Sequence, residues 1–260
     1  MTGISASERA MHQHEPAADE LDGRVILITG AGSGIGKAIA VAAAALGAEI
    51  ILVGKSLKPL EAVHAGIEQA APPGRALIAQ LDLERALARD YDQLAAAIAQ
   101  RYGRLDGLVH CAAQLGTLAP VDHYDVPTWC RVLHVNLTAA FALTQVLLPL
   151  LRASQDASIV FTSCSAGRAA AAYWGAYAVS KAAVEAFSRV LADENTRHAQ
   201  LRFNTLDPGS ARTALRRAAF PSEDPRGTPE PATLVKPYLW LLSANSRGIT
   251  GQSLRARAAA

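Results

Sequence analysis

The sequence predicts an α/β fold in a single domain, with a doubly wound parallel β-sheet and helices on both of its faces. Short apolar runs alternate with longer segments of helical periodicity along the 260 residues. Each run is almost continuously apolar, as is typical of strands that are buried on both faces. No repeat or linker interrupts the alternation, and strands separated by helices indicate βαβ units in one sheet.

The expected elements follow one another in regular order. The strands are expected at 25–29, 49–54, 75–80, 106–110, 158–163 and 201–206, and the helices at 35–46, 57–70, 86–102, 127–152, 175–197 and 231–243. The segment 132–151 is apolar on nearly every side, which predicts burial against the sheet and also allows burial against a second subunit. The sequence leaves these two environments as equal alternatives.

The beginning of the chain differs from the rest in composition. Residues 1–20 are polar and poor in large hydrophobic side chains, which predicts a disordered tail ahead of a domain at 21–260. Met11 is an alternative start to Met1. The tail lacks the apolar core of a secretory signal, and the apolar stretches further on are too short to span a bilayer. We therefore expect a cytoplasmic protein.

Charge and cysteine content exclude several classes of function. The chain has 25 Lys and Arg against 23 Asp and Glu, so its formal net charge of +2 gives little attraction to nucleic acid or to a membrane surface. Cys111, Cys130 and Cys164 are far apart and have neither disulfide-framework nor metal-ligand spacing. We expect a small-molecule partner, with no metal, nucleic acid or membrane involved.

A glycine-rich turn follows the first expected strand. Gly30, Gly34 and Gly36 form the pattern TGxxxGxG where this strand meets a helix. Glycines here let the main chain approach a pyrophosphate and leave N–H groups free at the helix N-terminus. After a buried strand, this turn indicates a Rossmann dinucleotide site. A P-loop is excluded, because Ala31 and Ala38 stand where it needs glycine and Ser or Thr.

The end of the second expected strand indicates which dinucleotide binds. A site for NAD normally has Asp or Glu there, to accept hydrogen bonds from the ribose 2′-hydroxyl. In this chain the strand ends in VGKS, with Gly54 in that place and Lys55 next to it. A basic residue favours a 2′-phosphate, so we expect NADP rather than NAD.

Tyr177 and Lys181 lie one helical turn apart in YAVSK, on the same face of the expected 175–197 helix. A free tyrosine has a pKa of about 10 and is a poor acid–base group at neutral pH. A neighbouring ammonium stabilises the phenolate and lowers that pKa. The pair therefore predicts a proton-transfer site.

With these motifs, residues 21 to about 253 resemble the short-chain dehydrogenase/reductase family. The matching pieces are TGAGSGIG (29–36), LDL (81–83), RLDG (104–107), VN (135–136), YAVSK (177–181) and DPGSART (207–213). The sequence is most similar to a bacterial subgroup of poorly characterised oxidoreductases.

The resemblance implies an NAD(P)-dependent enzyme that interconverts a carbonyl and a secondary alcohol, and a homo-oligomer, either a dimer or a tetramer. Tyr177 would exchange the proton with the substrate oxygen, Lys181 would lower the pKa of Tyr177 and bind the nicotinamide ribose, and Asn136 would hold a relay water. The implied cofactor-binding residues, with Lys55, are Gly30, Ser33, Gly34, Ile35, Gly36, Asp82, Leu83, Ala112, Tyr177, Lys181, Pro208 and Gly209.

The sequence departs from the family pattern at two places. After the fourth strand it has HCAA at 110–113, where the family has NNAG or HNAG. At the catalytic serine position, thirteen residues before Tyr177, it has Cys164, and a thiol is the weaker hydrogen-bond donor. Either Cys164 or a neighbouring serine, Ser163 or Ser165, would take the role. A cysteine nucleophile would need a histidine base and a serine hydrolase would need glycine at 163, so both are disfavoured.

These departures leave open a non-catalytic alternative, a dinucleotide-binding sensor or partner subunit. Residues 209–230 stand where the family has its substrate-covering loop. Arg212, Arg216 and Arg217 predict either an anion-recognising lid or, preferably, a solvated basic face balanced by acidic neighbours. The final QSLRARAAA lacks the usual glycine-rich ending, which predicts a shortened or frayed last strand.

Overall fold

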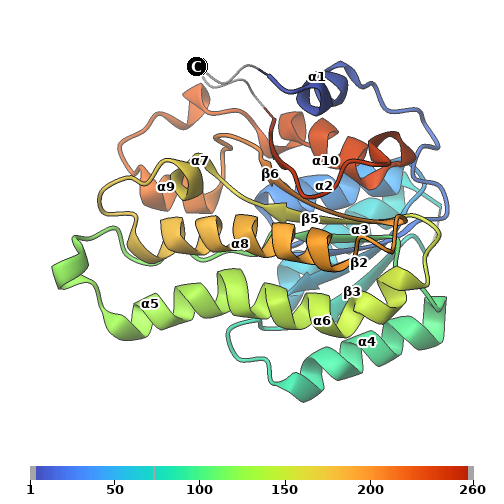
Figure 1. Cartoon of the computed structure of the whole chain (residues 1–260), viewed down its shortest axis with the longest axis horizontal. Coiled ribbons are helices and arrows are strands. Elements are labelled where there is room, and N and C mark those ends of the chain that lie inside the picture. The colour runs from blue at the N-terminus through green and yellow to red at the C-terminus, as the bar shows by residue number, and fades with distance from the viewer. Residues whose placement is uncertain (1–3, 73, 257–260) are drawn as a thin grey trace.

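A parallel β-sheet forms the centre of the molecule (Figure 1). The computed structural model describes residues 4–72 and 74–256. In this part the sheet has seven strands in the order β3-β2-β1-β4-β5-β6-β7. The strands are β1 (Val25–Thr29), β2 (Glu49–Gly54), β3 (Ala76–Gln80), β4 (Gly107–His110), β5 (Ala157–Thr162), β6 (Leu201–Asp207) and β7 (Ser253–Arg255). The order reverses between β1 and β4, as in a Rossmann fold, and confirms the predicted fold class.

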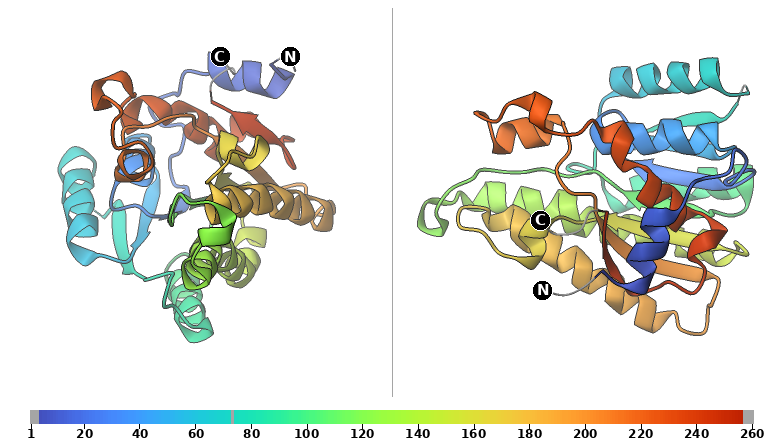
Figure 2. Two further views of the ribbon diagram at one scale, coloured as in Figure 1. Left: turned by 90° about the vertical axis from the view of Figure 1, so that its left-hand side faces the viewer. Right: turned by 90° about the horizontal axis from the view of Figure 1, so that it is seen from above.

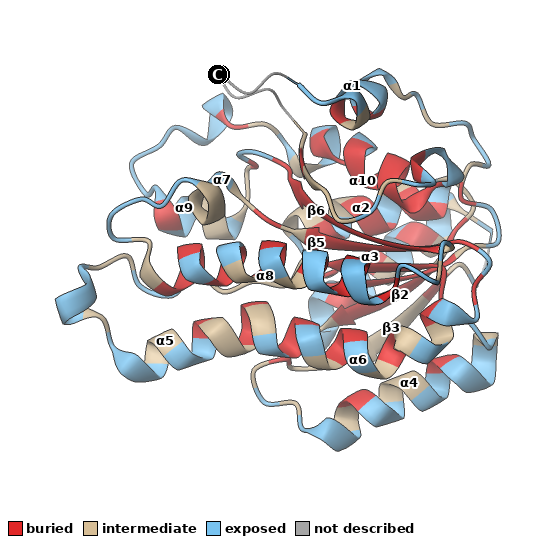
Figure 3. Cartoon of the chain, in the orientation of Figure 1, coloured by how far each residue is buried: buried red, intermediate tan, exposed pale blue. Residues whose placement is uncertain are grey.

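Helices cover both faces of the sheet, and the long helices have buried residues on the side that faces it (Figures 2 and 3). One core cluster joins the sheet to α2 (Gly34–Ala45), α3 (Leu57–Ala70) and α10 (Lys236–Leu242). The other cluster joins it to α4 (Ala88–Tyr102), α6 (Ala139–Arg152) and α8 (Gly175–Glu194). The short helices are α1 (Ala6–Gln13), α5 (Val126–Leu133), α7 (Ser165–Arg168) and α9 (Ala214–Ala219).

The six predicted strands and their order are confirmed, with ends that differ by one residue at most. All residues of β1, β4 and β6 are buried, which explains the apolar sequences of β1 and β4; β6 also buries polar residues, among them Arg202 and Asn204. The seventh strand has only three residues and pairs with β6 from Thr205↔Ser253 to Asp207↔Arg255. It is short, as the missing glycine-rich ending predicts.

The predicted helix at 127–152 is divided by a π-turn. Helix α5 ends at Leu133, residues His134–Thr138 form the π-turn, and α6 continues to Arg152. The stretch Val126–Arg152 is long and apolar enough to cross a membrane by length and composition. Its apolar side, however, includes fully buried leucines in the core against the sheet. Packing in the core therefore accounts for this apolar character.

The prediction of disorder before residue 21 is wrong for residues 6–13, which form α1. Ser5 and Glu8 form a capping box at the start of this helix. Met11 is only 1 % exposed and packs in the core with α10. The Glu8 carboxylate accepts a hydrogen bond of 2.9 Å from the backbone N–H of Arg255 in β7. One buried methionine and one cap thus order a segment that is polar on average. The domain boundary at residue 21 stays a prediction.

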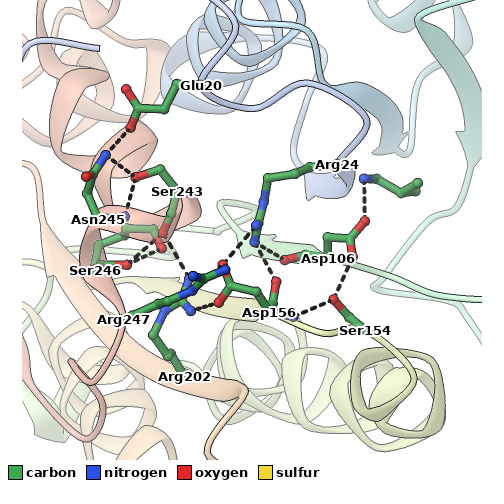
Figure 4. A network of polar contacts seen from close by, with 12 residues as sticks. Glu20, Arg24, Asp106, Ser154, Asp156, Arg202, Ser243, Asn245, Ser246 and Arg247 are labelled. Carbon is green, nitrogen blue, oxygen red and sulfur yellow. Dashed lines mark hydrogen bonds and ion pairs between the residues drawn. The ribbon is translucent and has the colours of Figure 1, made fainter. Parts of the chain in front are cut away.

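A buried polar network joins the strands at the end where β1, β4, β5 and β6 begin (Figure 4). Its centre is Asp156, whose carboxylate binds Arg24 at 3.0 Å and also pairs with Arg202. The Arg24 guanidinium also donates to the backbone carbonyls of Asp106 and Asp156. The carboxylate of Asp106 accepts the backbone N–H of Val25 at 2.9 Å. The network fixes the amino ends of the strands, so their carboxyl ends emerge in register at the opposite edge.

Candidate active site

An open cavity of about 1030 Å³ lies at the carboxyl end of the sheet, where the strand order reverses between β1 and β4. This is where open α/β sheets bind their ligands. All thirteen predicted cofactor-binding residues line it: Gly30, Ser33, Gly34, Ile35, Gly36, Lys55, Asp82, Leu83, Ala112, Tyr177, Lys181, Pro208 and Gly209. Cys164 lines it as well. Residues that are far apart in sequence therefore meet around one space.

The glycine turn between β1 and α2 has no room for side chains. Gly30 has a φ of +68°, and a Cβ there would lie 3.0 Å from the backbone of Ala112. A Cβ on Gly36 would lie 2.5 Å from the carbonyl oxygen of Gly30. Ser33 precedes α2 in extended conformation and makes no side-chain cap, which leaves the N–H groups of the first turn open to the cavity. This cradle fits a pyrophosphate group.

The end of β2 carries no carboxylate. Gly54 ends the strand, and Lys55 and Ser56 follow it at the rim of the cavity. The Lys55 side chain is exposed, and its backbone carbonyl accepts a hydrogen bond of 3.0 Å from the Gln80 amide. The acidic residues of the lining in this region, Asp82 and Glu84, follow β3 instead. The rim fits a 2′-phosphate better than a free 2′-hydroxyl.

The HCAA turn after β4 is braced by a threonine from β1. The Thr29 hydroxyl accepts hydrogen bonds from the backbone N–H groups of Cys111 and Ala112, each of 3.1 Å. The Cys111 thiol contacts Thr162 Oγ1 at 3.1 Å, and burial raises the pKa of this thiol to about 11. Among the described residues only Tyr173 combines a side chain with a positive φ, so Ala113 needs no glycine-like backbone. The turn is thus stable without the amide and the glycine that the family uses.

Asn136 lies in the π-turn, and its side-chain amide forms hydrogen bonds with two neighbouring residues. Its Oδ1 accepts from the N–H of Gln114 at 2.7 Å, and its Nδ2 donates to the carbonyl of Gln114 and to Ser180 Oγ. It does not line the large cavity; it borders a second cavity of about 10 Å³, together with Lys181 and His110. Such a volume holds about one water molecule.

Three consecutive residues at the end of β5 and just beyond it, Thr162 to Cys164, each lie near a different residue of α8. The carbonyl of Thr162 accepts a hydrogen bond of 2.7 Å from Lys181 Nζ. Ser163 Oγ donates to Glu185 at 2.6 Å. Cys164 lines the cavity together with Tyr177, and its thiol is near enough to raise the pKa of the tyrosine. Ser163 and Cys164 reach different residues because the extended backbone directs neighbouring side chains to opposite sides.

These contacts distinguish Ser163, Cys164 and Ser165, the three candidates for the place of the catalytic serine. Ser163 is buried against Glu185 and cannot also face Tyr177. Ser165 is the first residue of α7 and is exposed at the cavity. Of the three candidates, only Cys164 both lines the cavity and affects Tyr177 without such a contact to α8, so it stays the residue predicted for the serine position.

The pKa of Tyr177 is shifted opposite to the predicted direction. Burial raises it, and the Cys164 thiol and the Asp207 carboxylate add to the increase. Lys181 Nζ lies 5.5 Å from the centre of the tyrosine ring and is bound to Thr162. Burial also lowers the pKa of Lys181. The predicted lowering by Lys181 is wrong for this structure, because both groups are desolvated and the ammonium is directed to a backbone carbonyl.

An aromatic chain leads from Tyr177 to the rim of the cavity. The ring centres of Trp174 and Tyr177 are 5.8 Å apart, and those of Trp174 and Phe220 are 5.7 Å apart. The guanidinium of Arg216 lies 3.8 Å above the Phe220 ring and forms two hydrogen bonds with Glu223. Trp174 and Phe220 were not predicted as site residues, although the position of Trp174 three residues before Tyr177 is a usable signal.

Two of the three predicted lid arginines are paired with carboxylates. Arg216 binds Glu223 at 2.6 Å, and Arg212 binds Glu230 at 2.6 Å. Their charges are therefore balanced within the loop, as the basic-face alternative predicts. In residues 4–72 and 74–256 no cluster of three or more His, Cys, Asp or Glu side chains is arranged to hold a metal ion.

Comparison with known proteins assigns the family. The sequence pattern of short chain dehydrogenases matches residues 24–224. The oxidoreductase YciK of Escherichia coli K12 is 43% identical over 249 residues, which cover 95% of this chain and 96% of that protein.

Solved structures agree with this comparison. A short chain dehydrogenase of Escherichia coli CFT073, complexed with NADPH, is 44% identical with a TM-score of 0.90, covering 94% of this chain and 100% of that one. A Shigella flexneri 2a enzyme complexed with NADP is 42% identical with a TM-score of 0.88, covering 92% and 99%. The resemblance seen in the sequence is confirmed: the chain belongs to the short chain dehydrogenase family of NAD(P)-dependent oxidoreductases.

Proposed function

We propose that this chain is an NADP(H)-dependent oxidoreductase that interconverts a carbonyl and a secondary alcohol. The observation that carries the proposal is that Tyr177, Lys181 and Cys164 line the same cavity as the glycine turn. A dinucleotide on that turn and a carbonyl compound beside Tyr177 can therefore meet.

Different parts of the cavity lining would hold different parts of the cofactor. The turn at Gly30–Gly36 would hold the pyrophosphate, and Lys55 the 2′-phosphate. Asp82 and Leu83 would border the adenine, while Ala112 and Pro208–Gly209 would border the nicotinamide. When bound, NADP(H) supplies or accepts the hydride at the substrate carbon. The relatives crystallised with NADPH and NADP support this choice over NAD, as does the absence of a carboxylate after β2.

Tyr177 would transfer the proton. In reduction its hydroxyl donates a proton to the carbonyl oxygen as the hydride reaches the carbon, and the product is the alcohol. The hydroxyl is protonated at neutral pH and can supply this proton, but burial raises its pKa, so the phenolate that forms needs stabilisation by the nearby Lys181 ammonium. The small cavity between Asn136 and Lys181 has space for one water that would return the proton.

Cys164 would hydrogen-bond the carbonyl oxygen where the family uses serine. A thiol is the weaker donor, so polarisation of the carbonyl is reduced but not lost. The same substitution is the reason to keep a second candidate, a dinucleotide-binding protein without turnover. The intact Tyr177 and Lys181 favour the enzyme.

The substrate side of the cavity favours an apolar carbonyl compound. Trp174 and Phe220 form a wall that begins at Tyr177, and alanines at 166, 169 and 171 leave space in front of it. Since Arg216 is paired with Glu223, the wall offers stacking rather than charge.

We also propose a cytoplasmic homo-oligomer, a dimer or a tetramer. Phe141 on α6 and Val179 and Val190 on α8 are 45%, 46% and 49% exposed, although they are apolar. A second copy would cover them.

The proposal is tested by titrating NADPH and NADH against the intrinsic fluorescence of the protein, followed by turnover assays on cyclic, aromatic and aliphatic ketones. We expect tighter binding of NADPH and turnover that Tyr177→Phe abolishes while NADPH still binds. NADPH binding without turnover on any ketone would favour the non-catalytic candidate, and binding of neither dinucleotide would refute both.

A further inference from the structure

A buried carboxylate, Glu185, lies on the same face of α8 as Tyr177 and Lys181. Tyr177, Lys181 and Glu185 follow at intervals of four residues, so their side chains lie along one face of the helix. Glu185 is only 7% exposed. It is not among the residues that line the cavity in the described part of the chain, so it touches neither substrate nor cofactor.

Glu185 binds the turn that carries Cys164, residues 163–168, at both of its ends. One oxygen of its carboxylate, Oε1, accepts hydrogen bonds from Ser163 Oγ at 2.6 Å and from Arg168 Nε at 2.8 Å. Ser163 directly precedes Cys164, and Arg168 ends the short helix that follows it. Between them, a Cβ on Gly167 would lie 2.8 Å from the backbone of Lys181, so the turn packs directly on α8.

Arg168 extends the contact to two further segments. Its guanidinium donates to the carbonyl of Leu254 in β7 at 3.2 Å and lies 3.8 Å from the carboxylate of Asp207. Asp207 in turn accepts the N–H of Gly209 at 2.9 Å. The side chain of Arg168 is 23% exposed and that of Glu185 9%, so water screens this pair only partly.

We propose that Glu185 and Arg168 are positioning residues, which keep the Cys164 thiol against the Tyr177 hydroxyl. The inference rests on the proposed function, and it makes the catalytic geometry depend on Glu185, a carboxylate behind the cavity wall, and on its partner Arg168, which lines the cavity. A pair that served only stability would hold the fold together without affecting what Cys164 does.

The test is a double-mutant cycle with Glu185→Gln and Cys164→Ala, with NADPH oxidation as the assay. Glutamine keeps the size and an acceptor for Ser163 but loses the charge that binds Arg168. A misplaced group loses rate, so we expect Glu185→Gln to lower kcat several-fold, and by no more than Cys164→Ala does, because it acts through Cys164. KM for the ketone and the affinity for NADPH should change by less than about twofold, because those contacts lie elsewhere.

In the Cys164→Ala background the same Glu185→Gln change should cost less than about twofold, because the group that it positions is gone. Equal losses in both backgrounds would refute positioning through Cys164. Glu194→Gln, an exposed change on the same helix, is the matched control and should leave all constants unaltered.

A second readout needs no turnover. Iodoacetamide labelling followed by mass spectrometry reports the exposure of each thiol in the folded protein. We expect Glu185→Gln to increase labelling of Cys164 at least about threefold, since local release of the turn exposes it. The exposed Cys130 serves as an internal reference. Unchanged labelling of Cys164 would overturn the inference. If the wild type shows no turnover at all, the proposed function fails, and labelling alone decides whether Glu185 holds the turn.

Discussion

Asp156→Asn should destabilise the fold strongly without altering the active site. Asp156 is 6% exposed, and its carboxylate is shared by Arg24 and by Arg202, which is 1% exposed. Arg247, at 3.5 Å, is 67% exposed and contributes little. Asparagine keeps one oxygen but leaves two buried guanidinium groups without their counter-charge.

Removing one partner of a buried ion pair costs about 3–5 kcal/mol. Because asparagine retains one oxygen as an acceptor, we expect a loss of unfolding free energy near the lower end of this range, about 3 kcal/mol. At about 2–4 °C per kcal/mol, this loss lowers Tm by roughly 6–12 °C. Thermal unfolding followed by circular dichroism measures it, with the exposed Asp193→Asn as the control. NADPH affinity at low temperature should be unchanged, since Asp156 lies at the opposite edge of the sheet. A fall of less than about 2 °C would refute the view that this network fixes the strands.

Three further predictions concern the cavity. Gly36→Ala should weaken NADPH binding at least about tenfold in a fluorescence titration, because its Cβ would lie 2.5 Å from the carbonyl oxygen of Gly30. Gly66→Ala, whose Cβ would meet no other atom within 4 Å, is the control. Equal NADPH affinities of the two variants would contradict the role of the glycine turn in binding the pyrophosphate. Burial lowers the pKa of His110 from 6.5 to about 3, so the unfolded chain binds the proton first and stability should fall as pH drops from 6.5 towards 3. His110→Asn should flatten this part of a pH–denaturation profile, and an unchanged slope would exclude His110 as its cause. Trp174→Ala should raise KM for aryl ketones at least about tenfold but not for small aliphatic ones, and a uniform increase would argue against stacking.

Much of the fold follows from local sequence. Continuous apolar runs identify buried strands, and the glycine turn marks the point where a helix must begin against β1. The helix α1 escaped prediction because composition averages over the segment, whereas its order depends on Met11 in the core and on Glu8 bound to Arg255. Such contacts join the two ends of the chain and leave no local pattern.

The site was predictable where residue type alone carries the chemistry. The glycines, Lys55, Tyr177 and Lys181 were located by motif, and the structure brings them to one cavity. The direction of the Tyr177 pKa shift was not predictable, because it depends on burial and on where the Lys181 ammonium points. Neither was the replacement of the family's amide brace by Thr29, which comes from a strand about eighty residues away.

The central claim is that Cys164 stands in for serine in an active NADPH-dependent enzyme, and the rate of NADPH oxidation in a single turnover tests it most directly. Wild type, Cys164→Ser and Cys164→Ala would be compared with a ketone that the wild type reduces. A hydroxyl should improve the hydrogen bond to the carbonyl oxygen by about 1 kcal/mol, so we predict that serine accelerates the step several-fold. Alanine should slow it by a similar factor or more. Equal rates in all three proteins would contradict the account, because position 164 would then take no part in the reaction.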